Sequence, residues 1–299
     1  MTDARLIDTG YRRYDGPRLG GHHATVALWK HTLRRIFGLG RPARWKLLPV
    51  ASVAIAYVPN IVFVGVIALI PNARLRNGVL PGYAFTYGFI TAAIGLFVIF
   101  VAPEALCPDR RSGILSLYLA TPLTRTRYLI AKSLAVFTAL LCVTMGPALI
   151  YLIGRAAQNV GPSGFGGFMA TLGKIVLAGV IMAAFYTAIS IGASSITDRK
   201  AIAAAIIFFV GPAISAATAV AVNGLSAPKW IAGLSPSFLG SNAVFGFVLY
   251  LYHEGHSNAA RLDNGYFVPM AAFGGGIVLW MVIGGGVAWF RYSRLRVTR

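Results

Sequence analysis

The sequence predicts an all-α membrane protein with six transmembrane helices, and three observations lead to this fold class. Hydrophobic residues make up 57% of the 299 residues, while charged residues make up only 12%, about half the fraction typical of a soluble domain. Continuous apolar runs of about 20 residues recur, each long enough to cross a bilayer core of roughly 30 Å. These runs lack the period-two alternation of transmembrane barrel strands. The composition therefore argues against both a soluble core and a barrel.

The six spans are placed where apolar runs lie between short polar segments. They are expected over residues 47–70, 83–106, 129–153, 172–196, 201–222 and 267–290. No internal repeat divides the chain, so residues 47–290 are expected to form one transmembrane domain. A cytoplasmic N-terminal arm with an amphipathic helix (1–46) would precede it, and a basic cytoplasmic tail (291–299) would follow.

Residues 22–38 predict a basic amphipathic helix ahead of the first span. The apolar residues of this segment recur at helical spacing, and they are Val26, Trp29, Leu33, Ile36 and Phe37. Lysine, histidine and arginine occupy the other side. Such a helix is expected to lie in the membrane interface, with its tryptophan at headgroup depth. Residues 1–21 show no apolar periodicity, and they could be disordered or be ordered by a partner.

The distribution of basic residues decides the topology. The apolar run within residues 235–252 is only about 15 residues long, shorter than the roughly 17 to 25 residues of a full span. With six spans and both termini on one side, 21 of the 27 lysines and arginines fall on that side. This asymmetry is typical of the cytoplasmic side of a membrane protein. Residues 235–252 are therefore expected to be a re-entrant or interfacial element on the outer side.

The same asymmetry accounts for the net charge of +19 without a nucleic acid partner, because cytoplasmic loops face anionic lipid. Cys107 and Cys142 form no disulfide framework and no metal pattern. The sequence His253-Glu254-Gly255-His256 is not HExxH, and a solvated loop is the expected interpretation. The sequence also has no P-loop of the form GxxxxGK[ST]. No metal site, cofactor site or catalytic residue is expected in this chain.

One charged segment interrupts the apolar chain between the second and third spans, at residues 103–132. It is expected to be an exposed helix between the two spans, punctuated by Gly113 and Pro122. Ionisable residues are almost absent from the middle of the predicted spans. Because an ion-driven carrier usually needs a carboxylate there, this absence favours a transporter whose energy comes from outside the membrane.

The order of residues in this segment carries a resemblance to a known family. An acidic residue ends the second span, and a charged stretch with glycine, a short helix, a proline and a basic-aromatic start of the third span follow. The residues are Glu104, Asp109, Arg110, Arg111, Gly113, Pro122, Arg125, Tyr128 and Lys132. The segment resembles the permease subunits of ATP-binding-cassette (ABC) transporters of the type-2 exporter class. The resemblance extends to the six-span layout, but it is close at residue level only over 103–132.

This resemblance implies a permease subunit of an ATP-driven exporter in a bacterial cytoplasmic membrane, moving an amphipathic or hydrophobic substrate. Two copies of a separate ATPase subunit would dock at the nine residues, with a short helix over 109–120 acting as a coupling helix in the ATPase groove. Glu104 would hold the loop in place through a nearby basic residue. Two permease chains would pair, as a homodimer in the simplest case, among membrane lipids. The partner would bind and hydrolyse ATP, so this chain would be neither an enzyme nor a holder of a cofactor.

Two other functions compete with this interpretation. A non-transporting membrane scaffold that anchors a soluble partner would also be docked at 103–132, but it would not stimulate ATP hydrolysis. An intramembrane enzyme would need a nucleophile or a metal cluster within the spans, and the sequence suggests neither. The sequence does not distinguish drugs, peptides and lipids as substrates.

Overall fold

The computed structural model describes residues 16, 20–71, 81–120, 122–235, 248, 251, 259–261 and 267–294. Six helices in these residues are long and apolar enough to cross a membrane, the number that the sequence predicts. They are Leu47–Leu69, Phe85–Arg111, Arg125–Ala157, Gly164–Ile196, Lys200–Gly224 and Met270–Ser293. The outer element predicted at 235–252 lies almost entirely outside the described residues. So do the cluster at 253–256, residues 1–15 and 17–19 of the N-terminal arm, and residues 295–299 of the tail.

The described part of the chain is mostly helical. In order it forms α1 (Gly21–Ile36), η1 (Ala43–Trp45), α2 (Leu47–Leu69), α4 (Tyr83–Leu96), η2 (Phe97–Val101), η3 (Ala102–Ala105), α5 (Cys107–Arg111), α6 (Leu115–Leu119), α7 (Arg125–Ala157), α8 (Gly164–Ile196), α9 (Lys200–Gly224), η4 (Lys229–Leu234), β1 (Ala259–Arg261), β2 (Phe267–Pro269) and α11 (Met270–Ser293). The two short strands pair antiparallel, with Ala260 opposite Val268.

The second span is a composite of four helical segments. It runs as α-helix through α4, becomes a π-helix in η2 and a 3₁₀ helix in η3, and ends as α5. Two prolines explain the irregular end, because Pro103 in η3 and Pro108 in α5 have no backbone N–H to donate. The charged segment is also divided. Where the sequence predicts one helix over 109–120, the structure has α5 and α6, separated by a turn at Ser112–Ile114.

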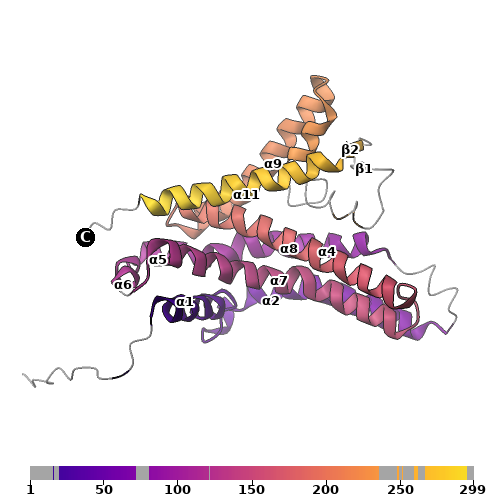
Figure 1. The fold of residues 1–299 in the computed structure, drawn as a ribbon, viewed down its shortest axis with the longest axis horizontal. Helices are drawn as coiled ribbons and strands as arrows, with labels where there is room; N and C mark the ends of the chain where they lie inside the picture. The colour runs from indigo at the N-terminus through magenta and orange to yellow at the C-terminus, as the bar shows by residue number, and fades with distance from the viewer. Residues whose placement is uncertain are drawn as a thin grey trace, which may run out of the picture.

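The second span is also the centre of the bundle. It contacts α2, α7, α8 and α9, and its π-helical turn is buried except for Phe100. Figure 1 shows α2, α4, α7 and α8 running side by side, with α11 over α8 and α9 leaning away from the others. Of the six spans, α9 is the least covered by the rest of the chain.

Helix α1 occupies most of the predicted segment 22–38 and packs along α7. Leu28, Thr32 and Ile36 are buried in this contact. The Trp29 indole N–H donates a hydrogen bond of 3.3 Å to the Thr138 hydroxyl of α7. Of the apolar face predicted from the sequence, Ile36 is buried and Trp29 contacts α7, while Leu28 and Thr32 of the buried set were not part of that face. The location of this face in a membrane interface stays a prediction.

Small residues bring α8 and α11 into backbone contact. A Cβ atom at Gly192 of α8 would lie 2.9 Å from the Gly284 Cα of α11, and a Cβ atom at Gly284 would overlap the backbone carbonyl of Ala188. Close approach at small residues is a common way for helices to associate in lipid, where contact area and dispersion drive packing. Gly285 is the next residue of α11, and a Cβ atom there would meet no other atom within 4 Å.

Substitution of Gly284 by alanine is therefore expected to destabilise the bundle. Neither helix backbone can move aside without losing its other contacts, and overpacking of this kind costs about 1–3 kcal/mol. Thermal unfolding of the purified chain in detergent would measure this as a lower midpoint. Gly285→Ala is the matched control and should leave the midpoint unchanged or slightly raised. Equal midpoints for the two variants would show that the contact contributes nothing.

Candidate functional site

Two carboxylates at the end of the second span gather the basic side chains of four other segments. Asp109 of α5 is fully buried. Its Oδ1 lies 2.7 Å from Arg35 Nη1 of α1, and its Oδ2 lies 2.6 Å from Lys132 Nζ of α7. The Tyr128 hydroxyl of α7 donates a third contact to Oδ2 at 2.9 Å. This one carboxylate therefore joins α1, α5 and α7.

Glu104 of η3 is almost buried and extends the cluster to α9. Its Oε1 lies 2.7 Å from Arg41 Nη1, in the segment after α1, and 3.5 Å from Arg35 Nε. Its Oε2 pairs with Lys200, the first residue of α9. Arg35 thus bridges the two carboxylates. We call these six residues the ion cluster: Arg35, Arg41, Glu104, Asp109, Lys132 and Lys200.

Three arginines beside the cluster bond to carbonyls at the ends of α8 and α11. The Arg110 guanidinium donates to the Ser195 and Thr197 carbonyls, and Arg291 Nη2 donates to the Ile196 carbonyl at 3.2 Å. Arg125 Nη1 donates to the Ser293 carbonyl at 3.0 Å. The last carbonyls of a helix have no partner within the helix, and cations are favoured there. These contacts fix α8 and α11 to the end of the bundle that carries the ion cluster. We call it the charged end.

Burial makes the ion cluster sensitive to the loss of any single member. Two charges that are moved out of water lose their hydration. Their mutual attraction offsets this loss only when the other hydrogen-bond donors and acceptors of the two charged groups also have partners. Around Asp109, two cations and one hydroxyl meet this requirement. The surroundings are strongly cationic. Partial burial together with the nearby Lys132 and Arg35 lowers the pKa of His31 on α1.

The tip of the charged segment is exposed. Gly113, in the turn between α5 and α6, has a φ of +69°, a conformation that favours glycine. Arg111 lies exposed before it. Two apolar residues after it are also exposed, Ile114 at 39% and Leu117 at 67%. Figure 1 places α5 and α6 at one extremity of the bundle, near the end of α11.

The nine residues predicted from the sequence thus fall into two groups. Asp109, Tyr128 and Lys132 are buried, Glu104 is almost buried, and Arg110 is half-buried against α8. The exposed members are Arg111, Gly113, Pro122 and Arg125. The structure brings the buried members together within one chain, and whether any of the nine contacts an ATPase stays a prediction.

Sequence reasoning missed three members of the ion cluster, although it expected Glu104 to meet a basic residue. Arg35, Arg41 and Lys200 lie 63 to 96 positions away from Glu104 along the chain. The basic side of the predicted amphipathic helix and the short turn before the fifth span were the available signals. Neither signal specifies which carboxylate a basic residue meets.

Removal of the Asp109 charge is expected to be more damaging than removal of any one cation of the cluster. Asp109→Asn leaves the buried Lys132 without its counter-charge and Arg35 with Glu104 alone, and breaking a buried pair costs about 3–5 kcal/mol. Lys132→Met leaves Asp109 paired with Arg35, so its effect should be smaller. The double variant should recover part of the loss. The measurement is the free energy of unfolding in detergent by denaturant titration.

Lys200→Met is the comparison for this series, because its side chain is 38% exposed and an exposed pair contributes about 1 kcal/mol or less. If Asp109→Asn were no more destabilising than Lys200→Met, the ion cluster would not depend on its buried carboxylate.

Comparison with known proteins agrees with this architecture. A family model described as ABC-2 family transporter protein matches residues 17–251, more than three quarters of the chain. A search of curated proteins found no match. The matched region contains five of the six apolar helices and the whole charged segment. The chain is therefore a multi-pass membrane protein and belongs to the ABC-2 family of transporter permeases.

Proposed function

We propose that this chain is the membrane subunit of an ATP-driven exporter that moves an amphipathic or hydrophobic substrate across a bacterial cytoplasmic membrane. Family membership supports the permease assignment and implies an ABC ATPase partner in general. In this proposal the partner is a separate subunit in two copies, and it alone binds and hydrolyses ATP. The charged end faces the cytoplasm, where basic residues gather.

The observation that carries the proposal is the exposed tip of the charged segment. Ile114 and Leu117 expose apolar side chains outside the membrane-spanning helices, beside the exposed guanidinium of Arg111. A short helix that offers apolar anchors and a cation fits a groove in a soluble partner. We assign docking to this tip rather than to Arg110, whose guanidinium is occupied by carbonyls of α8.

The ion cluster would then carry movement from the docked tip to the spans. Helix α5 leads directly from the tip to Asp109, and Asp109 holds α1 and α7. Through Glu104, the same end of the second span holds α9. A displacement of the tip would therefore act on several helices at once. A scaffold could dock a partner in the same way, but it would have no need to couple docking to α9.

Leu117→Glu is expected to abolish copurification of the ATPase subunit from detergent-solubilised native membrane. A carboxylate in place of an apolar anchor would have to be desolvated in the partner's groove. The measurement is a pull-down of the tagged chain followed by an assay of vanadate-sensitive ATP hydrolysis in the eluate. Arg111→Ala should reduce the same signal more weakly.

Leu225→Glu is the matched control, because Leu225 is 77% exposed and follows the last residue of α9, at the opposite end of that helix from Lys200. It should retain the ATPase. A wild-type chain that elutes without a nucleotide-binding partner would refute the exporter proposal. Retention of the partner by Leu117→Glu would refute docking at the tip.

Helix α9 is the span that we propose for pairing with a second copy of the chain. It is the least covered of the six spans, and its Phe209 and Val220 are more than 60% exposed. The substrate path would run between the copies, along the exposed faces of α2 and α9. The polar residues of the second span are excluded from this path, because Thr86, Tyr87 and Thr91 are all buried within the chain.

Cysteine crosslinking would test this pairing. In a Cys142→Ser background, Phe209→Cys or Val220→Cys should give a covalent dimer with a short bifunctional thiol reagent in native membranes. Leu177→Cys, on the exposed face of α8 at 47% exposure, is the control and should remain monomeric. A dimer from Leu177→Cys with none from either α9 position would place the interface elsewhere.

A further inference from the structure

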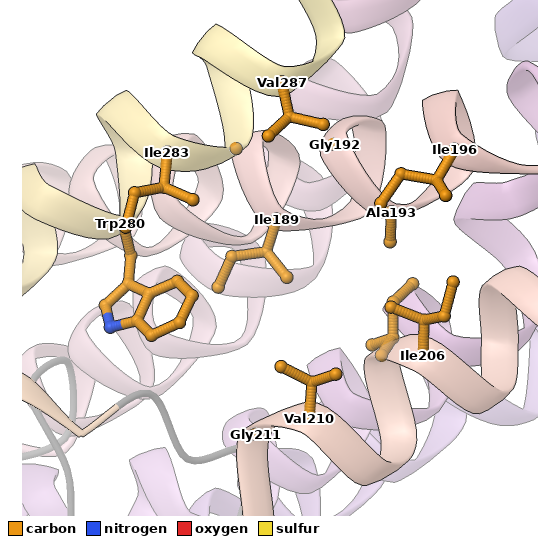
Figure 2. A pocket seen from close by; sticks show the side chains of 12 residues that line it. Ile189, Gly192, Ala193, Ile196, Ile206, Val210, Gly211, Trp280, Ile283 and Val287 are labelled. Atoms are coloured by element: carbon orange, nitrogen blue, oxygen red, sulfur yellow. The ribbon is translucent and has the colours of Figure 1, made fainter. Parts of the chain in front are cut away.

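An apolar groove lies between α8, α9 and α11. Its volume is about 120 Å³, and Figure 2 shows side chains from the three helices converging on it. Representative lining residues are Ile189, Ala193, Ile206, Val210, Trp280 and Val287. The space would admit several waters by size, but a water needs two to four polar partners and this lining is almost entirely apolar. Hydrocarbon is the occupant that such a lining favours.

The two ends of the groove differ. Trp280 closes one end, where its indole N–H donates to the Leu234 carbonyl at 2.9 Å and so fixes the ring. Ile196 lies at the other end, and its carbonyl accepts the hydrogen bond from Arg291 Nη2. The guanidinium of Arg291 therefore lies at the Ile196 end of the groove, which is also the charged end of the bundle.

The charge at that end favours an anion. Arg291 and Arg199 are both exposed there, and Arg199 lies three residues beyond Ile196. The exposed carboxylate of Asp198 is the opposing charge, while Arg110 is turned toward carbonyls of α8. Two exposed guanidinium groups against one carboxylate leave a net positive charge at this end of the groove.

The part of α11 from Trp280 to Arg291 is about as long as one leaflet, and the groove follows this part from Trp280 as far as Val287. Arg291 lies eleven positions after Trp280 along α11, which at 1.5 Å per residue is about 16 Å. Half of a hydrocarbon core of roughly 30 Å is about the same distance. A chain that begins at the phosphate level beside Arg291 would end beside Trp280.

We propose that this groove binds one acyl chain of an anionic phospholipid whose phosphate contacts Arg291 and Arg199. The lipid would fill the space that α9 leaves where it leans away from α11, and so it would support α9 from the side. This inference goes beyond the proposed transport function and does not depend on it. It requires neither the ATPase nor a direction of transport.

Retention of lipid by the full-length chain would test the proposal. The chain would be reconstituted in nanodiscs of equal phosphatidylglycerol and phosphatidylcholine, re-extracted in mild detergent, and analysed by native mass spectrometry. We expect wild type to retain phosphatidylglycerol preferentially. In Arg291→Gln this preference should fall about fivefold, the effect of one basic residue near anionic lipid.

Arg125→Gln is the matched control, because Arg125 also bonds to a helix-end carbonyl, but its partner Ser293 does not line the groove, whereas Ile196, the partner of Arg291, does. It should retain lipid as wild type does. Ala193→Phe and Val287→Phe fill the groove from two different helices, and each variant that remains monodisperse should retain less lipid of either kind. Equal retention of the two lipids by wild type would overturn the proposal. Retention by Arg291→Gln equal to that by Arg125→Gln would also overturn it, as would full retention by a groove-filling variant.

Discussion

The buried carboxylate of Asp109 is the constraint on which the charged end of the bundle depends. A carboxylate away from water is stable only with charged partners and hydrogen-bond donors around it. Here Lys132, Arg35 and Tyr128 fill these roles, and they come from α1 and α7. Each of these partners is itself partly or fully buried. The two cations therefore need the carboxylate of Asp109 as much as the carboxylate needs them. The positions of α1, α5 and α7 at this end are therefore specified together.

Glu104 is a second carboxylate in the same region, and its ion pairs are more exposed to solvent than those of Asp109. It shares Arg35 with Asp109, and its other partners, Arg41 and Lys200, are partly exposed. Trp45 lies beside both of these cations, with Lys200 Nζ 5.2 Å and Arg41 Cζ 5.5 Å from its ring centre. The segment 103–132 therefore has a fixed base and an exposed tip. In the proposed exporter, such a tip would receive force from the ATPase subunit and transmit it to the helices that the ion cluster holds.

The sequence predicted the parts of the fold that depend on local composition. Apolar runs identified six spans, and helical spacing identified α1, because both properties are present within about 20 neighbouring residues. The bonds between segments were not predictable in the same way. Nothing local to Glu104 indicates that its partners are Arg41 and Lys200, which lie 63 and 96 positions away. Nor did the charges of Asp109 and Lys132 predict burial, since charged residues between two spans are usually solvated. Here each neutralises the other.

The π-helical turn at Phe97–Val101 has a consequence for the carboxylates that follow it. A π-helical turn accommodates one residue more than an α-helical turn of the same rise. An α-helix advances by about 100° per residue. Without the extra residue, every side chain beyond the turn would therefore be rotated by about that angle around the helix axis. Glu104 and Asp109 would then face different neighbours from those that now hold them. A single-residue deletion in this apolar turn, three to seven residues before Glu104, would thus change the ion pairs at the charged end of the bundle.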